Sequence, residues 1–335
     1  MCTNFKMKPA ADGTIVVGRS MEFPNVLPYS LAVLPVGHAG TTLPSAGVAG
    51  KTWTGTYGVL GIAGLGHAGW LTDGMNTEGL TGHVLYMSAG FCVYPEFAGD
   101  GRDVSQIDVL AYLLTTCKDT AEVKAAVPGI NIWGTDPGMG FVAPIHVFMH
   151  DRTSSIAIEL HPGGTVQITD NPTGVGTNAP YLDWHLLNLQ NYVGFSAFTP
   201  DPTQIDGLDV GPFGQGQGLN MIPGGYTPPD RFVRAAVLVQ LASQPTDGKD
   251  AEQMVGHVLN SFDIIPGTVL EHMGGKVVSE ETTYDAIFNL TDLRFAYRTV
   301  TDPTWYSVDL KSVDFTKPAR LQPLSMQGDW AVTTI

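Results

Sequence analysis

Cys2 has both the side chain and the position to act as a nucleophile. If Met1 is removed, Cys2 carries a free α-amine, whose reference pKa of about 7.7 to 8.0 allows it to take the thiol proton near neutral pH. One residue would then supply the nucleophile and the base. This pair of groups is suited to attack on an amide carbonyl.

The residues after Cys2 predict a β-hairpin that positions it. Residues 2–8 and 14–19 alternate as strands, and residues 11–13 form a turn between them. If the turn centres on residues 12 and 13, antiparallel pairing sets Cys2 opposite a residue near Phe23.

Two charged residues of the second strand then fall within one or two positions of the chain terminus. Arg19 beside Cys2 would favour the thiolate electrostatically, and Glu22 would accept a hydrogen bond from the α-amine and orient it. A disordered terminus with an incidental cysteine is the competing interpretation of the same residues.

Five short blocks, in order along the chain, together resemble the choloylglycine hydrolase family, which includes penicillin V acylases and conjugated bile salt hydrolases. The C-terminal third adds only a compatible β-rich pattern. The blocks are Met1-Cys2-Thr3, Gly18–Phe23, Asp73–Leu80, Thr177–Pro180 with Asp183–Leu186, and Arg231–Ala236.

The resemblance implies an α+β fold, the four-layer αββα fold of N-terminal nucleophile hydrolases. It also implies assembly as a homotetramer and activity without a metal or cofactor. In this family Cys2 would be the nucleophile and Arg19 its neighbour. Glu22 stands where many relatives carry Asp, which lengthens the carboxylate arm by one methylene.

The resemblance also assigns an oxyanion hole, made of the backbone N–H of Tyr86 and the side-chain amide of Asn178. Donors of this kind commonly lower the barrier by about 3 to 4 kcal/mol each. Arg231 matches the late arginine of the family and would complete the polar set. An aromatic residue at position 86 resembles the penicillin acylase branch, whereas Asn is usual there in the bile salt branch.

The acyl pocket is predicted to be lined by Phe23, Tyr86 and Met87, whose apolar side chains favour an aryl or alkyl acyl group. The leading hypothesis is therefore a hydrolase of linear amides in small N-acyl compounds, similar to penicillin V acylase. Conjugated bile salts and acyl homoserine lactones are the alternative substrates. A catalytically silent binding or scaffold protein with the same fold is the alternative of a different class.

The content of charged residues restricts the kinds of molecule that the protein can bind. With 17 Lys and Arg against 32 Asp and Glu, the surface should repel nucleic acid and anionic lipid. No apolar run reaches the roughly 20 residues of a membrane span, and the first 30 residues lack the order of a signal peptide. We therefore expect a cytoplasmic or periplasmic protein with a small-molecule amide as its substrate.

Residues 1–335 show no linker or repeat and are predicted to form one domain. Residues 191–225, rich in Gly, Pro and Asp, are too long for an ordinary loop and are expected to pack against another subunit. Strands are predicted at residues 57–63, 79–86, 145–150, 155–160, 165–169, 286–290, 294–300 and 305–310, and helices at 104–116, 120–127, 230–241 and 251–262.

Three other patterns suggest chemistry and are better explained as structure. Residues 64–69 match GxGxxG, but no helix follows to hold a pyrophosphate, so a β-turn is favoured. His146 and His150 share strand parity without a third metal ligand, which favours packing histidines. Cys92 and Cys117 form no CxxC pair and are expected to be buried and inert.

Overall fold

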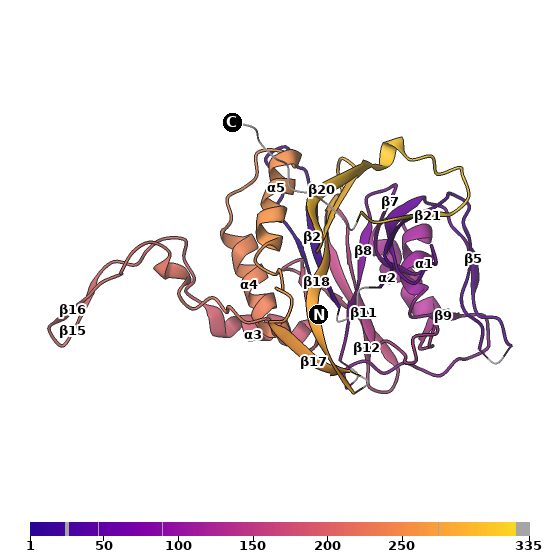
Figure 1. The fold of residues 1–335 in the computed structure, drawn as a ribbon, viewed down its shortest axis with the longest axis horizontal. Coiled ribbons are helices and arrows are strands. Elements are labelled where there is room, and N and C mark those ends of the chain that lie inside the picture. Colours follow the sequence, from indigo (N-terminus) through magenta and orange to yellow (C-terminus); the bar gives the residue numbers. More distant parts are fainter. Residues whose placement is uncertain (24–26, 46, 89, 274, 326–335) are drawn as a thin grey trace.

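The computed structural model describes residues 1–23, 27–45, 47–88, 90–273 and 275–325. Two large sheets stack face to face, with helices covering the outer face of each (Figure 1). Helices α3, α4 and α5 lie on one side, and α1 and α2 lie on the other. This arrangement confirms the predicted α+β fold with four αββα layers.

The first sheet contains the chain terminus. Its strand order is β14-β1-β2-β18-β19-β20, and β17 pairs with β18 beside this path. The strands are β1 (Cys2–Lys6), β2 (Val16–Phe23), β14 (Val175–Gly176), β17 (Val269–Met273), β18 (Lys276–Asn289), β19 (Arg294–Thr299) and β20 (Asp302–Asp309).

The second sheet has the order β13-β12-β11-β8-β7-β6-β3-β21. Its strands are β3 (Ser30–Leu34), β6 (Val59–Ala63), β7 (Leu71–Asn76), β8 (Thr81–Tyr86), β11 (Ile145–His150), β12 (Ser155–His161), β13 (Thr165–Asp170) and β21 (Arg320–Pro323). Three two-stranded sheets add β4 (Ala39–Thr41) with β5 (Thr52–Thr54), β9 (Asp103–Ser105) with β10 (Asn131–Trp133), and β15 (Thr203–Ile205) with β16 (Leu208–Val210).

Side-chain caps start three of the five helices. The carboxylates of Asp119 and Asp247 and the hydroxyl of Thr227 accept backbone N–H groups in the first turns of α2, α5 and α4. The helices are α1 (Val109–Thr116), α2 (Thr120–Ala126), α3 (Leu182–Asn188), α4 (Pro228–Leu241) and α5 (Gly248–Leu259). Among the described residues, no helix is long and apolar enough to cross a membrane.

The terminal hairpin forms as predicted, but its register differs. Cys2 pairs with Met21 rather than with a residue near Phe23. In the turn, Gly13 takes a positive φ of 86° and its N–H bonds the Ala10 carbonyl. The turn at residues 11–13, closed by the Ala10 N–H to the Thr14 carbonyl, accounts for one position of the two-residue shift. An extra residue on the first strand accounts for the other, because the pairing resumes where the Met7 N–H bonds the Val16 carbonyl.

Two predicted elements have different bounds. The helix expected from residue 104 starts at Val109, because Asp103–Ser105 is a strand paired in parallel with β10. The Asp103 carboxylate binds backbone N–H groups of the preceding loop, so tertiary contacts override the helical pattern there. The strand expected at 286–290 is the end of the longer β18, which pairs with β2 along the site.

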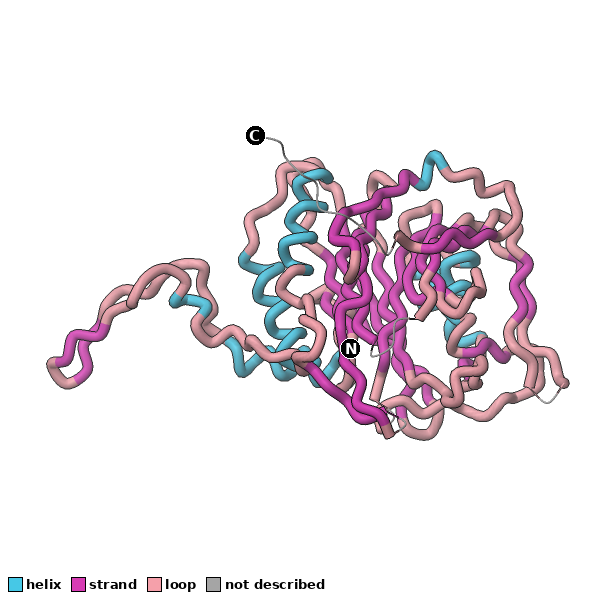
Figure 2. Tube along the Cα trace, in the orientation of Figure 1, coloured by secondary structure: helices cyan, strands magenta, loops and turns pink. Residues whose placement is uncertain are grey.

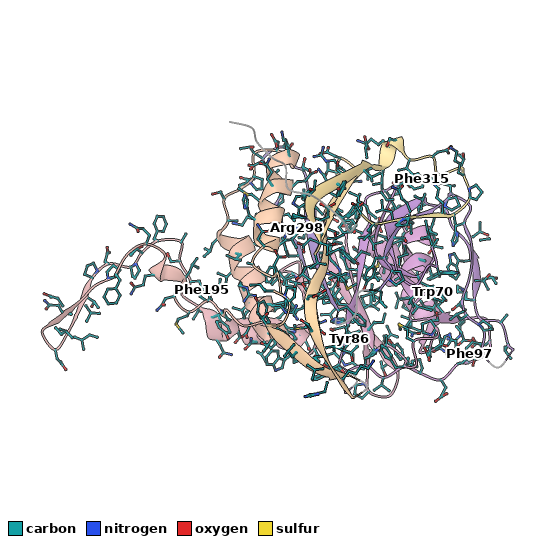
Figure 3. All side chains as sticks on the ribbon, in the orientation of Figure 1. Trp70, Tyr86, Phe97, Phe195, Arg298 and Phe315 are labelled. Atoms are coloured by element: carbon teal, nitrogen blue, oxygen red, sulfur yellow. The ribbon has the colours of Figure 1, made fainter. Side chains whose placement is uncertain are left out.

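Residues 191–225 extend away from the layered body as a long arm that ends in the β15–β16 hairpin (Figures 1 and 2). Large apolar side chains on this arm are exposed to solvent. They are Val193, Phe198, Ile205, Leu208, Phe213 and Met221. Figure 3 shows Phe195 where the arm leaves the body.

Candidate active site

Cys2 is the first residue of β1, and only 2% of its surface is exposed. Its side chain shares a face with that of Met21 on the neighbouring strand, and the two sulfur atoms are 3.9 Å apart. Both residues line an apolar cavity of about 130 Å³. The thiol therefore borders a space that can take part of a ligand.

Arg19 lies two positions from Met21, on the same face of β2. Its Nη2 is 3.5 Å from the Cys2 Sγ and donates to the Val84 carbonyl at 3.0 Å. Burial alone would lower the pKa of this guanidinium, but nearby negative groups, Asp73 first, outweigh burial and hold it well above the usual value. The guanidinium thus places a permanent cation beside the Cys2 sulfur.

Asp73, in β7 of the opposite sheet, holds Arg19 in place. One carboxylate oxygen accepts from Arg19 Nε at 2.8 Å and from His83 Nδ1 at 2.8 Å, and the other accepts the Tyr284 hydroxyl. Burial lowers the pKa of His83, so this imidazole is neutral near pH 7. Sequence reasoning assigned no role to Asp73, although it lies in one of the five blocks.

Glu22 is fully buried on the face of β2 opposite to Arg19 and Met21, because neighbouring side chains of a strand alternate. Its backbone carbonyl, not its carboxylate, accepts the Met1 amine, at 2.8 Å. The carboxylate accepts from Thr282 Oγ1 at 3.4 Å. Burial raises the pKa of this carboxyl, and the charge of Arg231 opposes the shift.

Asn178 and Arg231 fix the Cys2 backbone. The Cys2 N–H donates to Asn178 Oδ1 at 2.8 Å, and Arg231 Nη2 donates to the same oxygen at 2.6 Å. Arg231, from α4, also donates to the Cys2 carbonyl and to Thr3 Oγ1. With Oδ1 accepting two bonds, the Asn178 amide must direct its NH₂ the other way, toward Tyr86.

Tyr86 ends β8 next to that amide. Its carbonyl accepts from Asn178 Nδ2 at 2.6 Å. The following residue donates its N–H to Pro144 on the β11 side, so by alternation the polar groups of Tyr86 point away from β11. The Tyr86 N–H therefore points to the side on which the Asn178 amide bonds the Tyr86 carbonyl.

The cavity beside Cys2 has no charged residue among the described residues that line it. Phe23 and Tyr86 contribute to the lining, as predicted. Aromatic and aliphatic side chains from other elements complete it, namely Leu27, Tyr29, Leu65, Trp70, Leu71, Val84, Ile107, Met139, Phe141 and Ile145. Figure 3 labels Tyr86 and Trp70 on the layered body.

Met87 was also predicted to line the pocket, and the structure contradicts this. Its side chain is buried in the hydrophobic core between the second sheet and helices α1 and α2, and its N–H bonds Pro144. The strand pattern explains the difference, because residues next to each other in sequence direct their side chains apart and Tyr86 occupies the cavity side.

The patterns set aside from the sequence prove to be structural. Residues 64–69 form the turn between β6 and β7, with His67 packed on Trp70. His146 and His150 are buried in β11 and bond Glu159 and Ser155, respectively. Within the described ranges no group of three or more His, Cys, Asp or Glu residues could hold a metal ion.

The surroundings of the other two thiols disfavour their ionisation. Cys92 and Cys117 are free and buried. Burial raises the pKa of the Cys117 thiol to about 11 and also raises that of Cys92, so both remain protonated near neutral pH. Neither has an arginine beside its sulfur comparable to Arg19 at Cys2.

The profile of the linear amide C–N hydrolases of the choloylglycine hydrolase family matches residues 2–321. The chain belongs to this family. A bile salt hydrolase/transferase from Lactiplantibacillus plantarum is 30% identical over 240 residues, which cover 71% of this chain and 72% of the relative. One from Clostridium perfringens is 27% identical over 278 residues, covering 80% of each.

Solved structures of choloylglycine hydrolases share the fold. A mutant of the conjugated bile acid hydrolase from Clostridium perfringens superposes with a TM-score of 0.87, at 23% identity and complete coverage of both chains. Penicillin V acylase from Agrobacterium tumefaciens gives a TM-score of 0.77 at 19% identity, covering 96% of this chain and 90% of the acylase. The chain is thus an amidohydrolase with the four-layer fold.

As a choloylglycine hydrolase, this chain should depend on Asn178. Replacing Asn178 with Ala should lower kcat by about two to three orders of magnitude, with a smaller effect on KM, because the amide donor acts mainly in the transition state. Steady-state kinetics on purified, folded protein measures both constants. A change confined to KM would instead assign Asn178 to ground-state binding.

Proposed function

We propose that the protein hydrolyses small N-acyl amides through a thioester on Cys2, with an acyl half similar to that of penicillin V. The observation that carries this proposal is the position of the thiol. Cys2 borders an apolar cavity, with Arg19 at 3.5 Å from its sulfur and Asn178 bonded to its nitrogen. These contacts support the assignment of Cys2 as nucleophile, Arg19 as the neighbouring cation and Asn178 as an oxyanion donor.

In the proposed reaction the Cys2 α-amine takes the thiol proton, and the thiolate attacks the substrate carbonyl. The Tyr86 N–H and the Asn178 amide stabilise the oxyanion. As the C–N bond breaks, the α-ammonium returns a proton to the leaving amine, and the acyl group remains as a thioester. Water, activated by the α-amine, then hydrolyses the thioester and frees the acid.

The size of the cavity favours an aryl or medium alkyl acyl group. Its volume is about 130 Å³, whereas sites for drug-sized ligands start from about 300 Å³. A steroid acid would need the larger space, although the relatives compared above include bile salt hydrolases. Aryloxyacetyl and alkanoyl groups fit the apolar lining without burying a charge.

A substrate panel tests this proposal. Penicillin V, a medium-chain acyl homoserine lactone, glycocholate and taurocholate should be compared by kcat/KM, with burst release of the amine as the active-site count. We expect the first two to be hydrolysed at least about tenfold more efficiently than the bile salts. Preference for the bile salts would overturn the acyl assignment, and a protein that hydrolyses none of them and forms no thioester would overturn the function.

We further propose that the arm at 191–225 joins copies of this chain into a homotetramer. The arm exposes side chains such as Phe198 (83% exposed) and Phe213, and such residues are usually covered in a stable protein. A cavity of about 860 Å³, lined in part by Lys8, Tyr192, Phe195 and Val239, lies at its base and can receive the arm of a second copy.

The assembly is tested by sedimentation of the full chain and of a double variant, Phe198→Asp with Phe213→Asp. The full chain should sediment as a tetramer and the variant as a smaller species, because charges on the arm cannot be buried without cost. A variant in two solvent-facing lysines of the body, Lys311→Glu with Lys317→Glu, is the control. A full chain that sediments as a monomer would contradict the proposal.

A further inference from the structure

A buried carboxylate lies next to the chain terminus, on the strand beside the nucleophile hairpin. Glu280 of β18 is 4% exposed, and its Oε2 accepts the Met1 α-amine at 3.0 Å. The Met1 amine also bonds the Glu22 carbonyl at 2.8 Å. The mechanism proposed above assigns no role to Glu280, although this carboxylate is buried beside the chain terminus.

Met1 marks the position that the amine half of a substrate has to reach. The leaving nitrogen must come within hydrogen-bond distance of the Cys2 nitrogen to receive its proton, and Met1 is bonded to that nitrogen. Successive backbone nitrogens are at most about 3.7 Å apart. Because Met1 N is 3.0 Å from Glu280 Oε2, the carboxylate lies within about 7 Å of the Cys2 nitrogen.

The two arginines of the site direct their hydrogen bonds at protein groups, although the charge of Arg231 still interacts with Glu22 and Glu280. Arg231 is fully buried, and its guanidinium donates to Tyr226, Cys2, Thr3 and Asn178. Arg19 is also fully buried and is paired with Asp73. Both cations are therefore committed to protein groups, and neither has a free edge toward the amine side.

A second acidic group strengthens this local field. Burial raises the pKa of the Tyr86 phenol, and the carboxylates of Glu271 and Glu280 add to the shift. Tyr86 stands at the mouth of the cavity, with 38% of its surface exposed. Two carboxylates, those of Glu271 and Glu280, thus lie near Tyr86 on this side of the site.

We propose that Glu280 is a specificity residue for the amine half of the substrate and that it selects amides whose leaving amine is uncharged or positively charged. Amides of amino acids, aminosulfonates or other anionic amines, the carboxylate-bearing amine half of penicillin V included, would react more slowly than neutral or cationic amides of the same acyl group. The inference rests on the proposed hydrolysis at Cys2 and narrows the range of its substrates. Among amides that share one acyl group, those of an amino lactone or a cationic amine are preferred over those of an anionic amine.

Three substrates with the same phenoxyacetyl group isolate this effect: the amides of glycine, of glycinamide and of ethylenediamine, whose amine halves are anionic, neutral and cationic. For the wild type we expect kcat/KM to be at least about tenfold higher for the neutral and cationic amides than for the anionic one. Raising the salt concentration should reduce this ratio, since the charge difference is then screened.

Glu280→Gln should bring the three kcat/KM values to within about threefold of one another, by raising the value for the anionic amide and lowering that for the cationic amide. Glu78→Gln is the control. It removes the same charge from an exposed residue of the turn before β8, at the opposite end of that strand from Tyr86, and it should keep the wild-type ranking. Both variants are confirmed by mass to begin at Cys2.

Equal wild-type kcat/KM values for the three amides would overturn the inference. An equal loss of kcat/KM for all three amides in Glu280→Gln would also overturn the inference. It would show instead that Glu280 positions the Cys2 amine. Failure of the proposed function is a different result, in which no amide is hydrolysed and no acyl group is found on Cys2. If Glu280→Gln does not fold, the wild-type ranking and its salt dependence still decide the matter.

Discussion

Replacing Cys2 with Ala should abolish hydrolysis of every amide substrate, with a loss of at least about four orders of magnitude in kcat. The substitution removes the sulfur on which we propose that the thioester forms. Neither buried thiol should replace it, since burial raises the pKa of both Cys92 and Cys117. Steady-state assays with a sensitive amine readout measure the loss.

The fold should survive this change. The Cys2 side chain is small, and the hydrogen bonds that fix its backbone, from Cys2 N–H to Asn178 and from Arg231 to the Cys2 carbonyl, do not involve the sulfur. We expect a destabilisation of about 1 kcal/mol, visible as a small fall in Tm. A well-folded Cys2→Ala protein that still hydrolyses amides would show that another group is the nucleophile.

Retention of Met1 should abolish activity as completely. The Cys2 nitrogen is then an amide, which has no lone pair basic enough to take a proton near neutral pH. Met1 also blocks the amine side of the site, because its own amine is held by Glu280 at 3.0 Å and by the Glu22 carbonyl. We therefore expect the Met1-bearing chain to be an inactive precursor.

The precursor can be prepared by expression with methionine aminopeptidase inhibited, and then treated with the purified aminopeptidase. Activity should rise in proportion to the fraction of chains that begin at Cys2, as measured by intact mass. The Cys2→Ala protein, processed in the same way, controls for contaminating hydrolases. Equal activity before and after removal of Met1 would exclude the α-amine as the base.

Local sequence patterns predicted the hairpin of β1 and β2 that carries Cys2. The exact pairing of its two strands depended on the segment around the turn at residues 11–13. Alternation and the turn residues placed Cys2 and Arg19 on neighbouring strands, and the structure sets Nη2 of Arg19 3.5 Å from the sulfur. The turn and an extra residue beside it moved the register by two residues. A shift of two residues leaves every side chain on its own face, so Glu22 lies on the other face of the sheet from the thiol in either register.

The contacts that join distant segments could not be predicted from spacing. Asp73 reaches Arg19 from the opposite sheet, and Glu280 reaches the terminus from β18, separated from it by 279 positions along the chain. Neither residue has a local signature, since a single carboxylate in a strand is usually solvent-exposed. For Asp73 the available signals were its place in one of the five blocks and the need of a charged residue within an apolar strand for a buried partner.

Trapping the acyl-enzyme tests the central claim most directly. The processed protein is mixed with a phenoxyacetyl amide, quenched with acid during the burst, and analysed by intact mass and peptide mapping. The account predicts chains that begin at Cys2 and carry one acyl group each, located on the Cys2 sulfur and absent from the Cys2→Ala protein. Turnover with no covalent intermediate, or with the acyl group on a different residue, would contradict it.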